Sequence, residues 1–197
     1  MKFDLEQFND KETPKSLHAI NEISSQIGFD LQPDNKTGAL LQLLVSSKPD
    51  GIFLELGTGT GITTSWMLNG MSHKASLITI DRDESTQKIA KHSIGLDSRI
   101  TFKCCDALEF LKEQKKASYD LIFADALPGK WEYMEETISL LKPGGLYVVD
   151  DMLPFDDWPD YQYPKALENI ETLKSIKNIN TVGLHWSTGL VIVSPKY

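Results

Sequence analysis

Short runs of apolar residues alternate with stretches of helical periodicity through the central part of the chain. Strands are predicted over 52–56, 77–80, 100–103, 119–124 and 146–149, with helices over 62–68, 85–93, 107–115 and 131–141. The apolar runs are continuous rather than alternating, which is typical of strands covered on both faces. Strands separated by helices indicate βαβ units and a mainly parallel sheet.

The two ends of the chain follow different patterns. Residues 178–186 and 189–193 are strand-like runs separated only by Ser187 and Thr188. So short a link cannot hold a crossover helix, so this pair is predicted to be an antiparallel hairpin. Amphipathic helices are predicted over 16–27 and 37–46. We therefore expect an α/β fold with a doubly wound, mainly parallel sheet that ends in an antiparallel strand, preceded by N-terminal helices.

Length and charge narrow the classes of partner. The 197 residues fit one domain over 1–197, with N-terminal helices in 1–47 and the core in 48–197. The formal net charge of −8 disfavours a nucleic-acid partner, because phosphate contacts need clustered Lys and Arg. No run approaches the roughly 18 apolar residues of a membrane span, and the first residues do not resemble a signal peptide. We expect no nucleic-acid or membrane partner and a cytoplasmic location.

A glycine-rich turn follows the first predicted strand. Residues 55–61 read ELGTGTG, with a carboxylate two places before the first glycine. A dinucleotide fingerprint would read G-x-G-x-x-G and face a pyrophosphate. Glu55 would repel pyrophosphate but suits a ligand that carries an ammonium or sulfonium group. The turn therefore disfavours a nicotinamide-dependent oxidoreductase.

Two further carboxylates stand where predicted strands end. Asp81 ends the second strand and Asp106 follows the third. In open parallel sheets ligands bind beyond the carboxyl ends of the strands, so Asp81 could accept ribose hydroxyls and Asp106 could reach an adenine edge. Each also has a purely structural alternative as a helix cap, and the glycine run as a tight turn. Their common order along the chain favours a nucleoside-containing ligand.

On these residues the chain resembles the class I S-adenosylmethionine-dependent methyltransferases. The resemblance covers 37–193 and rests on FLELGTGTGITTSWML, LITIDRD, CCDALEFL, YDLIFADA and LLKPGGLYVVDDM. It implies a Rossmann-like sheet of seven strands with the last antiparallel, and it implies S-adenosylmethionine as cofactor. The cofactor-binding residues that it implies are Glu55, Leu56, Gly57, Thr58, Gly59, Gly61, Thr63, Asp81, Arg82, Asp106, Ala107, Asp125 and Ala126.

Within that superfamily the chain is most similar to the small O-methyltransferases related to the catechol and caffeoyl-coenzyme A enzymes. Their pattern has an Asp after the fourth strand and an Asp-Asn or Asp-Asp pair after the fifth, matched by Asp125, Asp150 and Asp151. The resemblance implies these as ligands of a divalent metal, Mg²⁺, Mn²⁺ or Ca²⁺, which would lower the pKa of an acceptor hydroxyl. Asp125 and Lys130 are the candidate catalytic groups, with Lys130 as proton acceptor.

Two features depart from that pattern. The related enzymes carry D-x-x-K, whereas Lys130 follows Asp125 by five positions with Pro128 and Gly129 between them. Asp151 also replaces the commoner Asn and adds a negative charge. Metal-dependent and metal-free transfer therefore both stay open. So do turn-capping roles for Asp150 and Asp151, and a solvated helix-start position for Lys130.

We expect an enzyme that transfers a methyl group from S-adenosylmethionine to a hydroxyl oxygen of a small molecule. The alternatives are metal-independent transfer to a small amine or carboxylate, and a non-catalytic S-adenosylmethionine-binding module. Base-methylating enzymes carry N/D-P-P-Y/F after the fourth strand, where residues 124–127 read ADAL. The loop 152–161 is a candidate wall or lid for the acceptor. A homodimer is expected from the resemblance.

Overall fold

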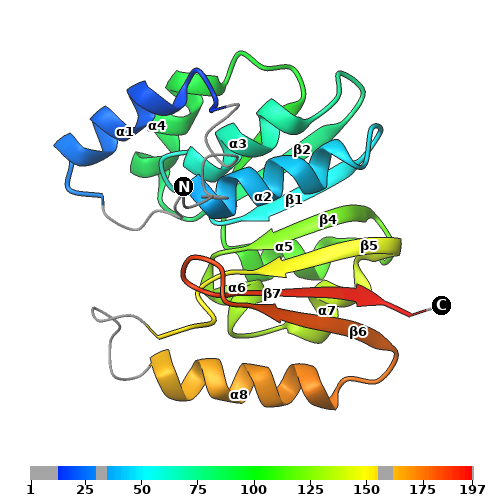
Figure 1. Ribbon diagram of the computed structural model, residues 1–197. Coiled ribbons are helices and arrows are strands. Elements are labelled where there is room, and N and C mark those ends of the chain that lie inside the picture. Colours follow the sequence, from blue (N-terminus) through cyan, green and yellow to red (C-terminus); the bar gives the residue numbers. More distant parts are fainter. Residues whose placement is uncertain (1–12, 30–34, 155–161, 197) are drawn as a thin grey trace, which may run out of the picture.

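The computed structural model describes residues 13–29, 35–154 and 162–196, which form one sheet with helices packed on both faces (Figure 1). The strands are β1 (Ile52–Leu56), β2 (Ser76–Asp81), β3 (Ile100–Cys104), β4 (Tyr119–Ala124), β5 (Leu141–Val149), β6 (Ile179–Leu184) and β7 (Leu190–Pro195). The helices are α1 (Leu17–Gln26), α2 (Asn35–Ser46), α3 (Ile62–Gly70), α4 (Glu84–Ile94), α5 (Ala107–Glu113), α6 (Leu127–Lys130), α7 (Met134–Ser139) and α8 (Gln162–Ser175).

The sheet has seven strands in the order β3-β2-β1-β4-β5-β7-β6. Neighbouring strands from β3 to β5 are parallel, and β7 runs antiparallel to both β5 and β6. This confirms the doubly wound, mainly parallel sheet and the terminal hairpin. The winding reverses between β1 and β4, whose ends pair as Leu56 with Ala124. The loops that follow these two strands therefore leave the sheet side by side, where open α/β sheets bind their ligands.

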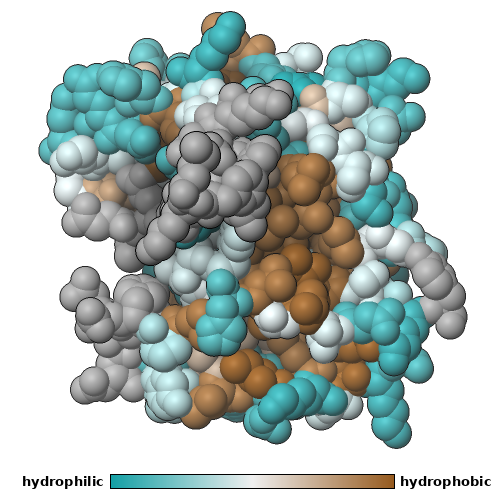
Figure 2. All heavy atoms as spheres, in the orientation of Figure 1, coloured by the Kyte–Doolittle hydropathy of each residue, from teal (hydrophilic) through white to brown (hydrophobic). Residues whose placement is uncertain are grey.

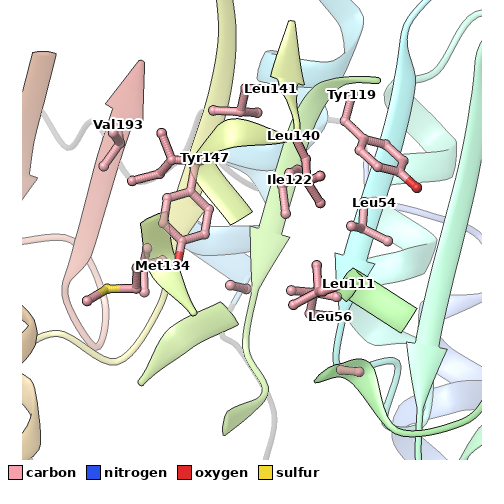
Figure 3. Close-up of a cluster of buried hydrophobic side chains, with 14 of the residues drawn as sticks. Leu54, Leu56, Leu111, Tyr119, Ile122, Met134, Leu140, Leu141, Tyr147 and Val193 are labelled. Atoms are coloured by element: carbon pink, nitrogen blue, oxygen red, sulfur yellow. The ribbon is translucent and has the colours of Figure 1, made fainter. Parts of the chain in front are cut away.

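Alternate side chains of the strands build two core layers. Phe53 and Leu121 face α2 and α3 in one layer, while Leu54 and Ile122 belong to the other layer with α5, α7 and α8 (Figure 3). Burial of each such side chain contributes about 1.5–3 kcal/mol. Because both faces are covered, β1 and β4 are held by packing on either side, which fixes where the loops after them begin.

The N-terminal helices and the first βα units agree closely with the predicted positions. Helices α1, α2, α3 and α4 lie within two residues of the predicted starts and ends. Asp83 caps α4 by accepting a hydrogen bond from the backbone N–H of Ser85 at 2.8 Å. Gly61 precedes α3 with φ 94°, a left-handed conformation that favours glycine.

The segment after β4 differs from the prediction. The helix predicted over 131–141 is present only as the shorter α7, because Tyr133 adopts φ 61° and separates it from the short α6 that precedes it. Residues 142–145 lie within β5, where the register against β4 shifts between Tyr119 and Leu121. Helix α8 was not predicted, since only Ala166, Asn169 and Leu173 of its residues are buried. So thin an apolar stripe gives little periodic signal.

Apolar side chains also gather on the surface beside α2, over β5 and β7 (Figure 2). The half-buried apolar residues packed against the core layer of α2 and α3 are Leu40, Leu44, Ile94, Ile100, Leu146, Leu184, Trp186 and Ile192. Within 13–29, 35–154 and 162–196, none of the helices has the length and apolar character that a bilayer span requires.

Candidate active site at the switch point of the sheet

The turn after β1 is tight and packs closely against its neighbours, as its glycines permit. Gly57, Gly59 and Gly61 have φ values of 103°, 51° and 94°. A Cβ at Gly57 would lie 3.0 Å from the carbonyl oxygen of Asp125, and one at Gly59 would lie 3.1 Å from the ring of Phe29. At Gly57 and Gly59 the turn is therefore packed tightly against the loop after β4 and against Phe29, and a side chain at either position would be strained.

Asp81 ties the end of β2 to this turn. Its Oδ2 accepts a hydrogen bond from the backbone N–H of Gly59 at 2.7 Å, and its Oδ1 accepts one from Asp83 at 2.9 Å. A carboxylate offers about four acceptor positions, so each oxygen keeps one for a hydroxyl donor. The half-buried Asp81 is thus able to hold a diol beside the glycine turn.

Glu55 lies beneath the turn rather than on its surface. Its side chain is fully buried, and Oε2 accepts hydrogen bonds from the hydroxyls of Thr64 and Thr79, both at 2.5 Å. Among the described residues Oε1 has no hydrogen-bond partner. Burial, reinforced by the charges of Asp125 and Asp81, raises the pKa of Glu55 to about 8. A buried acceptor without a partner beside a glycine turn fits a ligand that carries a positive charge.

The remaining predicted cofactor residues lie around the same edge in different settings. Asp106 is exposed and caps α5 by accepting from the N–H groups of Leu108 and Glu109, the structural alternative noted above. Arg82 is exposed. Besides Glu55, the predicted residues that are buried are Leu56, Thr58, Gly61, Thr63 and Ala107.

A lysine and two carboxylates form an ion-pair cluster beside the turn. Lys130 is only 5% exposed, and its Nζ lies 2.8 Å from Asp125 Oδ1 and 2.5 Å from Asp151 Oδ2. The structure therefore excludes the solvated position considered for this lysine. Burial lowers the pKa of Lys130, but the two carboxylates outweigh it and raise that pKa above the usual range. The side chain is held as an ammonium ion, which does not suit a proton acceptor.

The backbone around Lys130 is fixed by buried hydrogen bonds. Gly129 adopts φ 88°, and its carbonyl oxygen accepts a hydrogen bond from the Tyr147 hydroxyl. The carbonyl oxygen of Lys130 accepts one from Asn169 of α8 at 2.5 Å. The Nζ also lies 5.5 Å from the centre of the Trp131 ring, within the range of a cation–π contact. The lysine is thus directed inward by its turn and by α8.

Asp150 belongs to the same edge but faces other donors. It is 1% exposed, and its Oδ1 accepts from the backbone N–H of Asp151 and the hydroxyl of Thr188, both at 2.7 Å. Burial, with the charges of Asp125 and Asp151, raises the pKa of Asp150 to about 7. Burial also raises the pKa of Asp125, although Lys130 opposes that shift.

The three carboxylates in this arrangement do not fit a divalent cation. Two of them direct oxygens at the Lys130 ammonium, and the third accepts from protein donors. Across the three described stretches of the chain, no three His, Cys, Asp or Glu side chains are grouped as metal ligands.

Several residues of the site were not predicted. Thr64, Thr79 and Gln87 form the polar network beneath the turn, and Asn169 and Thr188 come from distant parts of the chain. Single polar residues inside helices and strands carry no local signal of such contacts. Of the candidate lid 152–161, residues 155–161 lie outside the described residues.

A glycine turn at the switch point, with a carboxylate on the adjoining strand, defines the class of α/β proteins that bind nucleoside-containing ligands. The profile of one family, described as O-methyltransferase, matches residues 10–184. The chain therefore belongs to the O-methyltransferase family, as the sequence resemblance predicted.

Individual proteins agree with this assignment. A protein of Mycobacterium avium named "Putative O-methyltransferase" is 38% identical over 117 residues, which are 57% of this chain and 53% of that protein. The chain thus matches about half the length of the curated relatives.

Solved structures show the same fold at low identity. The O-methyltransferase from Bacillus cereus in complex with S-adenosylhomocysteine has a TM-score of 0.80 and 22% identity, over 98% of this chain and 97% of that one. The S-adenosylhomocysteine-bound methyltransferase of Podospora anserina has a TM-score of 0.81 and 18% identity, over 100% and 98% of the two chains.

Proposed function

We propose that this chain is an S-adenosylmethionine-dependent enzyme that methylates a hydroxyl oxygen of a small molecule. Family membership supports the class of reaction. The observation that carries the proposal is the joining of the glycine turn to Asp81 through the N–H of Gly59, 2.7 Å from Asp81 Oδ2. Through this contact a carboxylate that can accept hydrogen bonds from a diol lies beside glycines whose backbone a ligand could approach closely.

The described residues suit the three parts of the cofactor. Asp81 would accept the ribose hydroxyls, while Oε1 of Glu55, which has no partner among the described residues, lies beneath the turn, where a bound positive charge would favour the ionised carboxylate. Asp106 and Ala107 lie at the start of α5, beyond β3, where an adenine ring would lie at the sheet edge. The cofactor supplies a methyl group on a sulfonium sulfur, which becomes a neutral thioether as the acceptor oxygen forms its bond to carbon.

The residues of the chain position the acceptor and take its proton. Asp125 follows β4, and its backbone lies against the glycine turn, which supports a role for its carboxylate in accepting the hydroxyl proton as the oxygen attacks. Lys130 holds that carboxylate at 2.8 Å and balances its charge. Transfer is favoured chiefly because the two reacting groups are held together in line.

The test begins with binding of S-adenosylhomocysteine to the full chain, measured by titration calorimetry. Asp81→Ala should bind at least about tenfold more weakly, because hydrogen bonds to a charged acceptor are worth about 1.5–3 kcal/mol each. Asp50→Asn, at an exposed aspartate outside the site, is the matched control and should bind as the wild type does. Absence of binding by the wild type would overturn the proposal.

The acceptor class is tested with labelled S-adenosylmethionine and three probes, catechol, benzylamine and benzoate. We expect labelled product from catechol alone. Product from benzylamine or benzoate, without product from catechol, would contradict methyl transfer to a hydroxyl and favour transfer to an amine or carboxylate. Binding of cofactor without turnover of any small hydroxyl, amine or carboxylate compound would favour the non-catalytic module.

A further inference from the structure

The position of Lys130 is the feature that departs furthest from the pattern of the related enzymes. It bridges Asp125 Oδ1 and Asp151 Oδ2 at 2.8 and 2.5 Å, with a side chain that is 7% exposed. These are two of the three carboxylates that the resemblance assigned to a metal. The ammonium group therefore lies between the oxygens that a divalent cation would need.

We propose that Lys130 is a built-in cation that takes the place of a divalent metal in this protein. The inference concerns the same site as the proposed methyl transfer and rests on that function for its catalytic consequence. Two results are expected. The wild-type chain has no functional divalent-metal site at these carboxylates, and removal of the ammonium charge creates such a site.

The longer turn explains how the lysine reaches this position. Five positions separate Asp125 from Lys130, and the extra residues include Pro128 and Gly129. Gly129 has φ 88°, and a Cβ there would lie 2.3 Å from Leu56 Cδ1, so the turn is pressed against the end of β1. The turn then returns Lys130 toward the sheet, where Asn169 binds its carbonyl oxygen.

Charge makes the ammonium and a metal mutually exclusive. A divalent ion between Asp125 and Asp151 would lie against the lysine ammonium, and both would compete for the same two oxygens. Asp150 does not contact the ammonium, and its Oδ1 already accepts from Thr188 and the N–H of Asp151. The surplus negative charge that Asp151 adds, compared with Asn, is the charge that the lysine neutralises.

Lys130 would accordingly act as a positioning residue for Asp125. Its pair of contacts fixes the carboxylate beside the glycine turn, and its charge stabilises the carboxylate form. The reaction class then needs no divalent cation, and chelators should leave its rate unchanged. Loss of the lysine should lower the turnover of the acceptor more than the affinity for the cofactor.

The decisive experiment is a Mn²⁺ titration of metal-stripped protein, followed by electron paramagnetic resonance of the free ion. The wild type should show no binding in the micromolar range, whereas Lys130→Met should bind Mn²⁺ at least about tenfold more tightly, because Asp125 and Asp151 then face the ion without a competing charge. Adding Asp151→Asn to Lys130→Met should weaken that new binding.

Lys142→Met is the matched control. Lys142 pairs with one carboxylate, Asp120 at 2.7 Å, away from this cluster. This variant should leave Mn²⁺ binding at the wild-type level. Lys130→Gln provides a second uncharged variant if the methionine variant fails to fold.

The two proposals fail in different ways. Micromolar Mn²⁺ binding by the wild type, lost in Asp151→Asn, would overturn the built-in cation whether or not cofactor binds. Failure of the wild type to bind S-adenosylhomocysteine would instead overturn the methyltransferase function. A folded Lys130→Met or Lys130→Gln chain that gains no Mn²⁺ affinity would also count against the inference.

Discussion

At the scale of single residues, burial changes what a carboxylate can do. The sequence suggested Glu55 as a carboxylate suited to a positively charged ligand, and the structure buries its side chain on a network of threonine hydroxyls. Its raised pKa means that the folded protein retains a proton which the unfolded chain loses at lower pH. A positively charged ligand beside Glu55 would favour loss of that proton. The affinity for the cofactor and the ionisation of Glu55 are therefore linked.

Glu55 should make the free energy of unfolding fall as pH rises from about 4.5 to about 8. In that window the folded state binds the Glu55 proton more tightly than the unfolded chain does. The contribution of this proton to the free energy of unfolding is therefore complete below pH 4.5 and lost as pH passes about 8. The slope approaches about 1.4 kcal/mol per pH unit. Urea unfolding at several pH values should show a smaller slope for Glu55→Gln than for the wild type. The exposed Glu109→Gln is the control, and equal slopes in all three proteins would contradict this account.

At the scale of elements, close packing between helices positions the first βα unit. Helix α2 packs against α3, where a Cβ at Gly38 would lie 2.4 Å from Cδ1 of the buried Trp66. Helix α3 begins at the glycine turn, so this packing holds one side of the site. The helical periodicity predicted both helices, but not that a glycine would be needed at their contact.

Gly38→Ala should destabilise the protein by about 1–3 kcal/mol, because the added methyl overpacks the contact with Trp66. That cost should exceed the gain of about 1 kcal/mol that alanine brings to a helix. Gly183→Ala in β6, where nothing lies within 4 Å of the new Cβ, is the matched control. Thermal unfolding at fixed pH measures both variants, and an unchanged or higher midpoint for Gly38→Ala would refute the packing argument.

At the scale of the whole molecule, the N-terminal helices share the core of the sheet. Leu41 and Val45 of α2 are fully buried in one cluster with Phe53 and Val148. Ser24 of α1 donates a hydrogen bond to Thr60 of the glycine turn at 2.8 Å. Residues 13–29 and 35–47 are therefore joined to the sheet by buried contacts.

Calorimetry of the full chain should accordingly show one cooperative unfolding transition. A single domain over 1–197 predicts that the measured enthalpy equals the van't Hoff enthalpy. Deletion of 1–47 should abolish the unfolding transition rather than lower its midpoint temperature slightly, because Leu41 and Val45 are removed from the core. Two resolved transitions in the absence of ligand would contradict the single domain. The homodimer expected from the resemblance stays a prediction, which the mass from analytical ultracentrifugation would test.

The sequence by itself determined the order of strands and helices, the terminal hairpin and the family. Apolar runs, the glycine turn and Asp81 are local patterns, readable because each depends on neighbours close in the chain. The interrupted helix near Tyr133 and the weakly patterned α8 escaped that reading.

Only the tertiary structure decided what the charged groups face. Whether Glu55 is solvated and whether Lys130 contacts Asp151 depend on segments that lie far apart in the sequence. Charge interactions act through space and depend on burial, and burial is a property of the packed sheet and helices rather than of any short stretch of chain.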